Sequence, residues 1–250
     1  MFVHLPLLNV QRDLYRLPRG PERFAAYIRL MTGPDDTLAL PLAVLNPMAK
    51  AHVAERLEQL LALGAETLAA EAVARANERL APQIPIRLGL VVADDVAGGW
   101  TDRYLTDAQH RFEPGELRYG FATALLWAGE TYTAAALTEA VSAACYRTAH
   151  LLGHGPPRTL RQMMAQEGQA AAFAGMPETL EVDELAYTRA VVTPHLDKAA
   201  FPTAFACLYG DDAARSVGYA PLGLGADAGF ALALHDVRVG AGRAGSSSIS

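Results

Sequence analysis

Apolar residues recur every three or four positions along most of the chain, which is the spacing of amphipathic helices. The longest such stretch covers residues 47–80 and predicts a long amphipathic helix, which Gly64 could divide into two. Thr159 followed by Gln162 has the spacing of a capping box and predicts a helix start. Other helical patterns cover residues 21–31, 133–153, 159–174, 183–193 and 201–217. These patterns predict a mainly helical protein.

Three segments in the middle of the sequence depart from the helical pattern. Residues 86–93 (IRLGLVVA) form a short apolar run with β-branched residues, which predicts a strand. Residues 100–112 and 119–127 predict two further strands, whereas Pro and Gly residues within 1–20 predict irregular structure. We therefore expect a mainly helical α+β fold in which helices pack around a small central sheet.

The chain shows no internal repeat and no clear linker, so we expect a single globular domain over residues 1–240. Residues 241–250 are rich in Gly and Ser and predict a disordered tail. The domain can bury a large core, because 51% of the residues are hydrophobic and only 19% are charged.

Charge and cysteine content narrow the expected partners and compartment. The net charge is −6 and Lys and Arg do not cluster, which argues against nucleic acid as a partner. No apolar run is long enough to span a membrane, and the first residues lack the features of a signal peptide. Cys145 and Cys207 lie far apart in the sequence, which favours free buried thiols. We expect a cytoplasmic protein without a membrane partner.

Two histidines provide the first candidate chemistry. His150 and His154 are four residues apart near the end of a predicted helix, so both imidazoles point along one face. Two histidines need this spacing to share one zinc ion. Glu167 follows thirteen residues later on the next predicted helix. These three residues form a candidate site for a divalent metal.

Glu167 is unusual because it lies within an apolar stripe. Burying a carboxylate is costly unless it is paired, hydrogen-bonded or bound to a metal. Gly168 follows it and permits close approach of another backbone. An alternative is purely structural: Glu167 pairs with Arg147 or Arg158, and His154 interacts with the carboxyl end of its helix. The stripe consists of Leu160, Met163, Met164, Ala171 and Ala174.

The segments 150–154 (HLLGH) and 167–170 (EGQA), preceded by the predicted strand 119–127, resemble the gluzincin metallopeptidases. The resemblance is to the uncharacterised bacterial group of predicted zinc-dependent proteases, and it covers roughly residues 84–175. In that family an HExxH motif and a Glu-Gly-x-Ala helix bind zinc, and an edge strand binds extended peptide. The resemblance implies zinc ligands at His150, His154 and Glu167, within a gluzincin-like core.

The resemblance fails at the catalytic position. The family's glutamate follows the first histidine, where this chain has Leu151, and leucine cannot transfer a proton to or from zinc-bound water. A second alignment places Tyr146 and Arg147 at the first His and the Glu of the motif. Hydrolysis would need another base, for which Asp102, Glu130 and Glu139 are candidates. We expect either a degenerate metallopeptidase-like scaffold or a non-enzymatic binding protein that uses the same cleft without metal.

A Gly-rich loop offers residues for binding a peptide or small molecule. Residues 98–104 combine two glycines with Trp100, Asp102 and Arg103, and such loops often line pockets. These three residues and Tyr146, on the predicted site helix, are the predicted substrate-binding set. The same loop also suits a hairpin connection that carries an Asp–Arg pair. Nearby, His110 is interpreted as a solvated polar residue, with addition to the site as the alternative.

Overall fold

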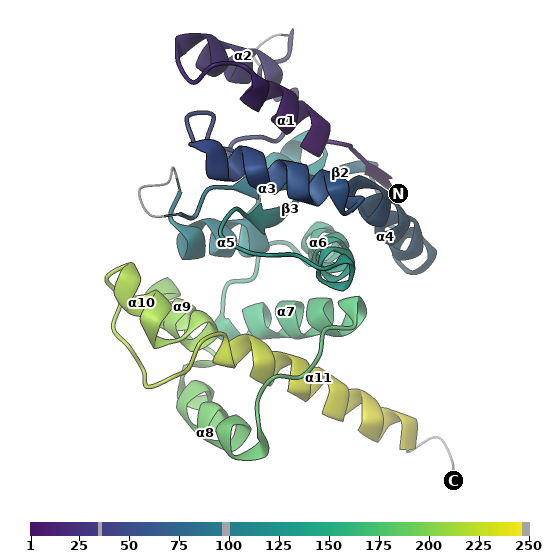
Figure 1. The fold of residues 1–250 in the computed structure, drawn as a ribbon. Helices are drawn as coiled ribbons and strands as arrows, with labels where there is room; N and C mark the ends of the chain where they lie inside the picture. The colour runs from purple at the N-terminus through teal and green to yellow at the C-terminus, as the bar shows by residue number, and fades with distance from the viewer. Residues whose placement is uncertain (35–36, 97–100, 247–250) are drawn as a thin grey trace. The chain divides into compact units, whose positions relative to one another are not determined.

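The computed structural model describes residues 1–34, 37–96 and 101–246, which form two compact units divided between Leu152 and Gly153 (Figure 1). Most described residues are helical, and the described strands form one small parallel sheet. This confirms the predicted mainly helical α+β class. The expectation of one globular domain over residues 1–240 stays a prediction.

The first unit contains the sheet. Strand β2 lies between β1 and β3, and all three run parallel. Because β2 is buried on both faces, its sequence is a continuous apolar run rather than an alternating one. The elements are β1 (Phe2–His4), α1 (Leu8–Arg16), α2 (Pro21–Met31), α3 (Ala51–Ala62), α4 (Ala65–Arg79), β2 (Ile86–Ala93), α5 (Arg103–Phe112), the 3-10 helix η2 (Gly115–Tyr119), β3 (Phe121–Trp127) and α6 (Ala134–His154).

Several predicted elements of this unit are confirmed. Gly64 adopts a left-handed conformation (φ 75°) between α3 and α4, so the long amphipathic stretch divides there. The predicted strand over residues 86–93 coincides with β2. The predicted strand over residues 119–127 becomes β3 after Gly120, whose φ of 75° ends η2.

Two predictions for this unit are wrong. Residues 1–20, predicted to be irregular, contain β1 and α1, because β1 pairs with β2 more than eighty residues away. Over its described part, the segment 100–112 contains helix α5 instead of the predicted strand, because Asp102 accepts a hydrogen bond from the Leu105 amide (2.9 Å) and starts the helix. The first error arises because a local pattern does not report a distant partner, whereas the second overlooks a local helix cap.

Side-chain amides complete the β1 side of the sheet. β1 ends at His4, and beyond it the amide of Gln11 donates to the Leu90 carbonyl (2.8 Å) and accepts from the Val92 amide (2.9 Å). On the other edge of β1, the Asn77 side chain accepts from Phe2 N–H (2.8 Å) and donates to Phe2 C=O (2.9 Å). Buried backbone groups that β1 is too short to pair are thereby satisfied.

The second unit is helical in its described part. It contains α7 (Leu160–Ala174), α8 (Val182–Val192), the 3-10 helix η3 (Thr193–His195), α9 (Phe201–Tyr209), α10 (Asp211–Ser216) and α11 (Ala228–Ser246). The predicted capping box at Thr159 and Gln162 is confirmed. The helix predicted over 201–217 is divided by Gly210, where a Cβ would lie 2.1 Å from the Gly225 carbonyl oxygen.

Helices α7 and α11 pack closely at Gly168. A Cβ there would lie 2.3 Å from the Ala233 carbonyl oxygen, which confirms the close backbone approach expected at this glycine. α11 continues to Ser246, into the segment predicted to be a disordered tail, and residues 247–250 lie outside the described residues.

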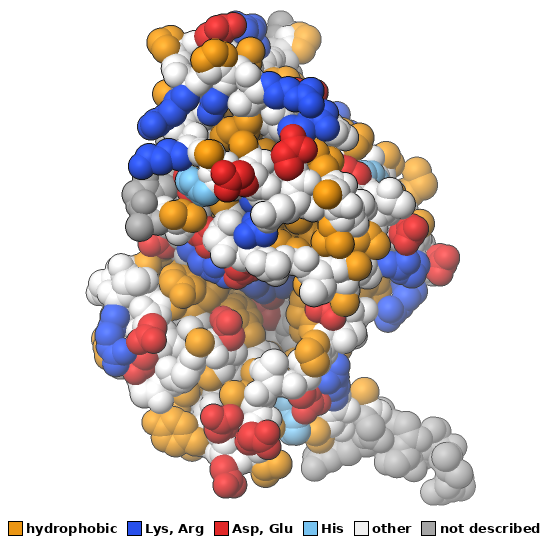
Figure 2. Space-filling model, in the orientation of Figure 1, with side chains coloured by type: hydrophobic (Ala, Val, Ile, Leu, Met, Phe, Trp, Pro, Cys, Tyr) orange, Lys and Arg blue, Asp and Glu red, His pale blue; other side chains and the backbone are white. Residues whose placement is uncertain are grey.

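The surface carries both signs of charge. Lys and Arg side chains occur among Asp and Glu side chains over the face drawn in Figure 2, in keeping with the modest net charge of −6. Within the part of the chain that the structure describes, no helix is long and apolar enough to cross a lipid bilayer.

Candidate functional site

The three predicted metal ligands belong to different units. His150 lies in the first unit on α6, where its ring stacks on Tyr146 with centroids 6.2 Å apart. His154 is the last residue of α6 and Glu167 lies on α7, both in the second unit. Glu167 is only 2% exposed and accepts a hydrogen bond from the Gln166 amide (3.2 Å), which confirms that its carboxylate is buried.

No group of three or more His, Cys, Asp or Glu side chains suited to hold a metal ion is present among residues 1–34, 37–96 and 101–246. The described residues therefore give the zinc site no support, and the assignment of His150, His154 and Glu167 stays a prediction from sequence. Leu151, which replaces the family's glutamate, is buried.

The predicted substrate-binding set of Trp100, Asp102, Arg103 and Tyr146 stays a prediction, and the structure shows the surroundings of three of its members. Trp100 lies outside the described residues. Asp102 caps α5, so its carboxylate is used in holding the helix start. Tyr146 is half-buried on α6, and this burial raises the pKa of its hydroxyl. Arg103 lies instead in a polar network at the carboxyl ends of the strands.

This network joins β2, β3 and α5. Arg103 forms ion pairs with Asp95 (2.7 Å) and Glu130, and its guanidinium lies 5.2 Å from the centroid of the Trp127 ring. Burial disfavours its charge, but the two carboxylates outweigh burial and raise the pKa of Arg103. Asp95 also accepts from the Gly129 amide (2.8 Å). Because its charges pair with each other, we interpret the network as structural: it holds the start of α5 against the ends of β2 and β3.

A neighbouring buried carboxylate has a similar role. Asp94 follows β2 and is 3% exposed. It accepts hydrogen bonds from Asn46 (2.8 Å) and from Nε2 of His52 (2.8 Å), which holds α3 and the preceding loop against the end of β2. The sequence pattern marks none of these side chains as partners.

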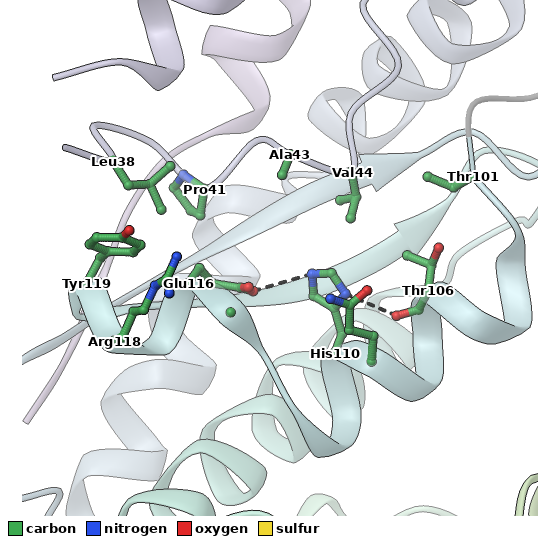
Figure 3. Close-up of a pocket in the computed structure, with 12 residues that line it drawn as sticks. Leu38, Pro41, Ala43, Val44, Thr101, Thr106, His110, Glu116, Arg118 and Tyr119 are labelled. Atoms are coloured by element: carbon green, nitrogen blue, oxygen red, sulfur yellow. Dashed lines mark hydrogen bonds and ion pairs between the residues drawn. The ribbon is translucent and has the colours of Figure 1, made fainter. Parts of the chain in front are cut away.

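The first unit contains a cavity of about 370 Å³, which we call the α5–η2 pocket. Leu38, Pro41, Ala43 and Val44 from the loop before α3 line it, together with residues of α5 and η2. Figure 3 shows His110 of α5 and Glu116 of η2 pointing toward each other, across from the loop residues. Ligand pockets of roughly 300–1,000 Å³ are typically apolar with a few placed polar groups, as here.

The neighbours of His110 favour a ring that is protonated on both nitrogens. Nδ1 lies 3.0 Å from the Thr106 carbonyl, and Nε2 lies 3.3 Å from Oε1 of Glu116. Both partners accept hydrogen bonds, and only the imidazolium donates from both nitrogens. Burial disfavours this charge, but the hydrogen bonds and the Glu116 carboxylate outweigh it and raise the pKa of His110.

Glu116 is the counter-charge of this pair. It also accepts from the Thr123 hydroxyl (2.8 Å), which links η2 to β3. Burial disfavours its ionised form, but hydrogen bonding and the charge of His110 outweigh burial and lower the pKa of Glu116. Each member of the pair thus favours the charged form of the other.

The interpretation of His110 as a solvated residue is wrong, because its side chain is only 15% exposed. The error follows from the predicted strand over residues 100–112, where a residue at this place has no fixed neighbour. In a helix, His110 lies one turn after Thr106 and reaches its carbonyl. Asp102 is a residue type that favours helix N-caps, and this signal in the sequence could have predicted the helix that places His110.

We compared the chain with protein-family models, with curated proteins and with solved structures, and none of the three comparisons found a match.

Proposed function

We propose that this protein binds a small organic molecule in the α5–η2 pocket. The observation that carries the proposal is a mostly buried histidine–carboxylate pair, His110 and Glu116, at the wall of an otherwise largely apolar cavity. Ionised groups are rarely kept in such places without a stabilising or binding role. Charged groups with shifted pKa values within a concave site are candidates for a functional site.

Filling the pocket with a larger side chain should weaken ligand binding without disturbing the fold. Ala43 is exposed at the pocket, so Ala43→Phe places a ring in the cavity, and Ala43→Ser serves as the small control. In ligand-observed NMR with small acids, bases and neutral compounds, we expect hits for the wild type and the Ser variant. We expect at least about tenfold weaker affinity for the Phe variant. Equal binding by the Phe and Ser variants, or no hit for the wild type, would contradict the proposal.

A second candidate function is binding of an extended peptide along β3, as the metallopeptidase resemblance implies. Arg87 N–H bonds Gly120 C=O and Ala128 N–H bonds Ala93 C=O (both 2.9 Å), so even-numbered residues of β3 face β2. The backbone groups of the odd-numbered residues face away from β2. No described residue forms a backbone hydrogen bond with the half-buried Thr123 and Leu125 on that side. On the β1 side of the sheet, by contrast, the side-chain amides of Gln11 and Asn77 pair with backbone groups. An open strand edge is where an added strand binds.

Proline at an outward-facing position tests this second function. Leu125→Pro removes an amide that pairs with no described residue, so the fold should persist while strand addition is blocked. Selection from a displayed library of random linear peptides should yield binders for wild type and for the control Leu125→Ala, but none that bind Leu125→Pro. Circular dichroism verifies that each variant is folded. Peptides that bind the Pro variant equally well would eliminate the β3 edge as their site.

A further inference from the structure

The α5–η2 pocket has one positive charge without a counter-charge. His110 and Glu116 neutralise each other, and the remaining charged residue in the lining is Arg118. Arg118 forms no ion pair with any residue in the described part of the chain. The pocket with the imidazolium present therefore has a net charge of one, and it favours an anion of one charge.

Tyr119 orients this arginine. The guanidinium carbon of Arg118 lies 4.7 Å from the centroid of the Tyr119 ring, within the range of a cation–π contact. Arg118 is exposed, and its guanidinium N–H groups form no ion pair with a described residue, so they can donate to a ligand. A carboxylate accepts two parallel hydrogen bonds from the edge of a guanidinium, which is the strongest pairing available to arginine.

The rest of the lining selects an apolar body. Leu38, Pro41, Ala43 and Val44 form the loop side of the cavity and carry no charge. The apolar body of a ligand gains free energy when it is buried against such a surface. A second anionic group, in contrast, would meet the Glu116 carboxylate and no further cation in the lining.

We propose that the ligand of the α5–η2 pocket is a small monocarboxylate with an apolar body. Its carboxylate binds Arg118, and its body packs against the loop residues 38–44. This inference rests on the proposed function, because it names the ligand class of the same pocket.

The same arrangement makes binding depend on pH. The groups facing His110 are Thr106 and Glu116, with Asp107 nearby on its own helix, while loop residues 38–44 carry no titratable side chain. When His110 loses its proton, Glu116 is no longer compensated and the net charge of the pocket falls to zero. Because the protonated form favours the anion, affinity declines as pH rises through the pKa of His110, which lies above its ordinary value.

Calorimetry with benzoate, cyclohexanecarboxylate and butyrate tests the inference, with benzamide as the neutral probe and phthalate and inorganic phosphate as probes of higher charge. We expect the three monocarboxylates to bind more tightly than benzamide or phthalate. Arg118→Gln should weaken their binding about tenfold, whereas Arg75→Gln, an exposed arginine on α4, should not. Affinity should decline between about pH 6 and about pH 9 in the wild type, and His110→Gln should remove this decline.

The outcomes separate the two proposals. Binding of neutral or basic compounds but of no carboxylate overturns the inference and leaves the proposed function standing. Carboxylate binding that Arg118→Gln does not weaken, or that is the same at both pH values, also overturns the inference. Failure of the wild type to bind any compound overturns both.

Discussion

Gln11→Leu is expected to lower the free energy of unfolding of the first unit by about 4 kcal/mol. Gln11 is fully buried, and its amide pairs with both the Leu90 carbonyl and the Val92 amide of the central strand. Leucine has a similar volume but no polar atoms, so both backbone groups remain buried without a partner. Each such orphan costs about 1–3 kcal/mol. Urea unfolding followed by Trp127 fluorescence measures the loss, since Trp127 lies in this unit.

The control for this variant is Gln59→Leu on α3. Gln59 is exposed and its side chain accepts a hydrogen bond from Arg56 on the same helix, so its replacement should change stability by less than about 0.5 kcal/mol. Gln11→Glu adds a second comparison, because a carboxylate accepts from Val92 but cannot donate to Leu90. A Gln11→Leu protein as stable as the Gln59 variant would show that the amide does not complete the sheet.

Gly168→Ala is expected to destabilise the second unit by about 3 kcal/mol. The added Cβ would lie 2.3 Å from the Ala233 carbonyl oxygen and 3.0 Å from a methyl of Val237, so α7 and α11 must move apart. Overpacking of this kind costs about 1–3 kcal/mol or more, and here the obstructing atom is backbone that cannot rotate away. Hydrogen-exchange mass spectrometry should report faster exchange of the amides of α7 and α11.

Gly240→Ala is the matched control for this prediction. It also lies on α11, but no atom would lie within 4 Å of its Cβ. Alanine favours the helix over glycine by up to about 1 kcal/mol, so this variant should be as stable as the wild type or slightly more stable. If Gly168→Ala behaves in the same way as Gly240→Ala, the close packing of the two helices is not as described.

Glu167 and His110 show how far sequence reasoning reaches toward a site. Glu167 was recognised because a charge within an apolar stripe is a local anomaly, and its burial is confirmed. His110 gave no such signal, because its partner Glu116 belongs to the return segment after α5 and is brought back by the turn between them. The predicted zinc site depends on the spacing of residues in the sequence, and spacing alone does not establish that three side chains meet.

Four features could be predicted from the amino-acid sequence: the mainly helical character, two of the three described strands, Gly64 as a possible break in the long helix, and the capping box that starts α7. These features depend on residues within one or two turns of each other, where periodicity, capping and glycine conformation act. Only the tertiary structure decided the pairing of β1 with β2, the amides that complete the sheet, and the pocket that holds the His110–Glu116 pair. Each of these joins segments that are far apart or that turn back on one another, and such contacts form only when the whole unit has folded.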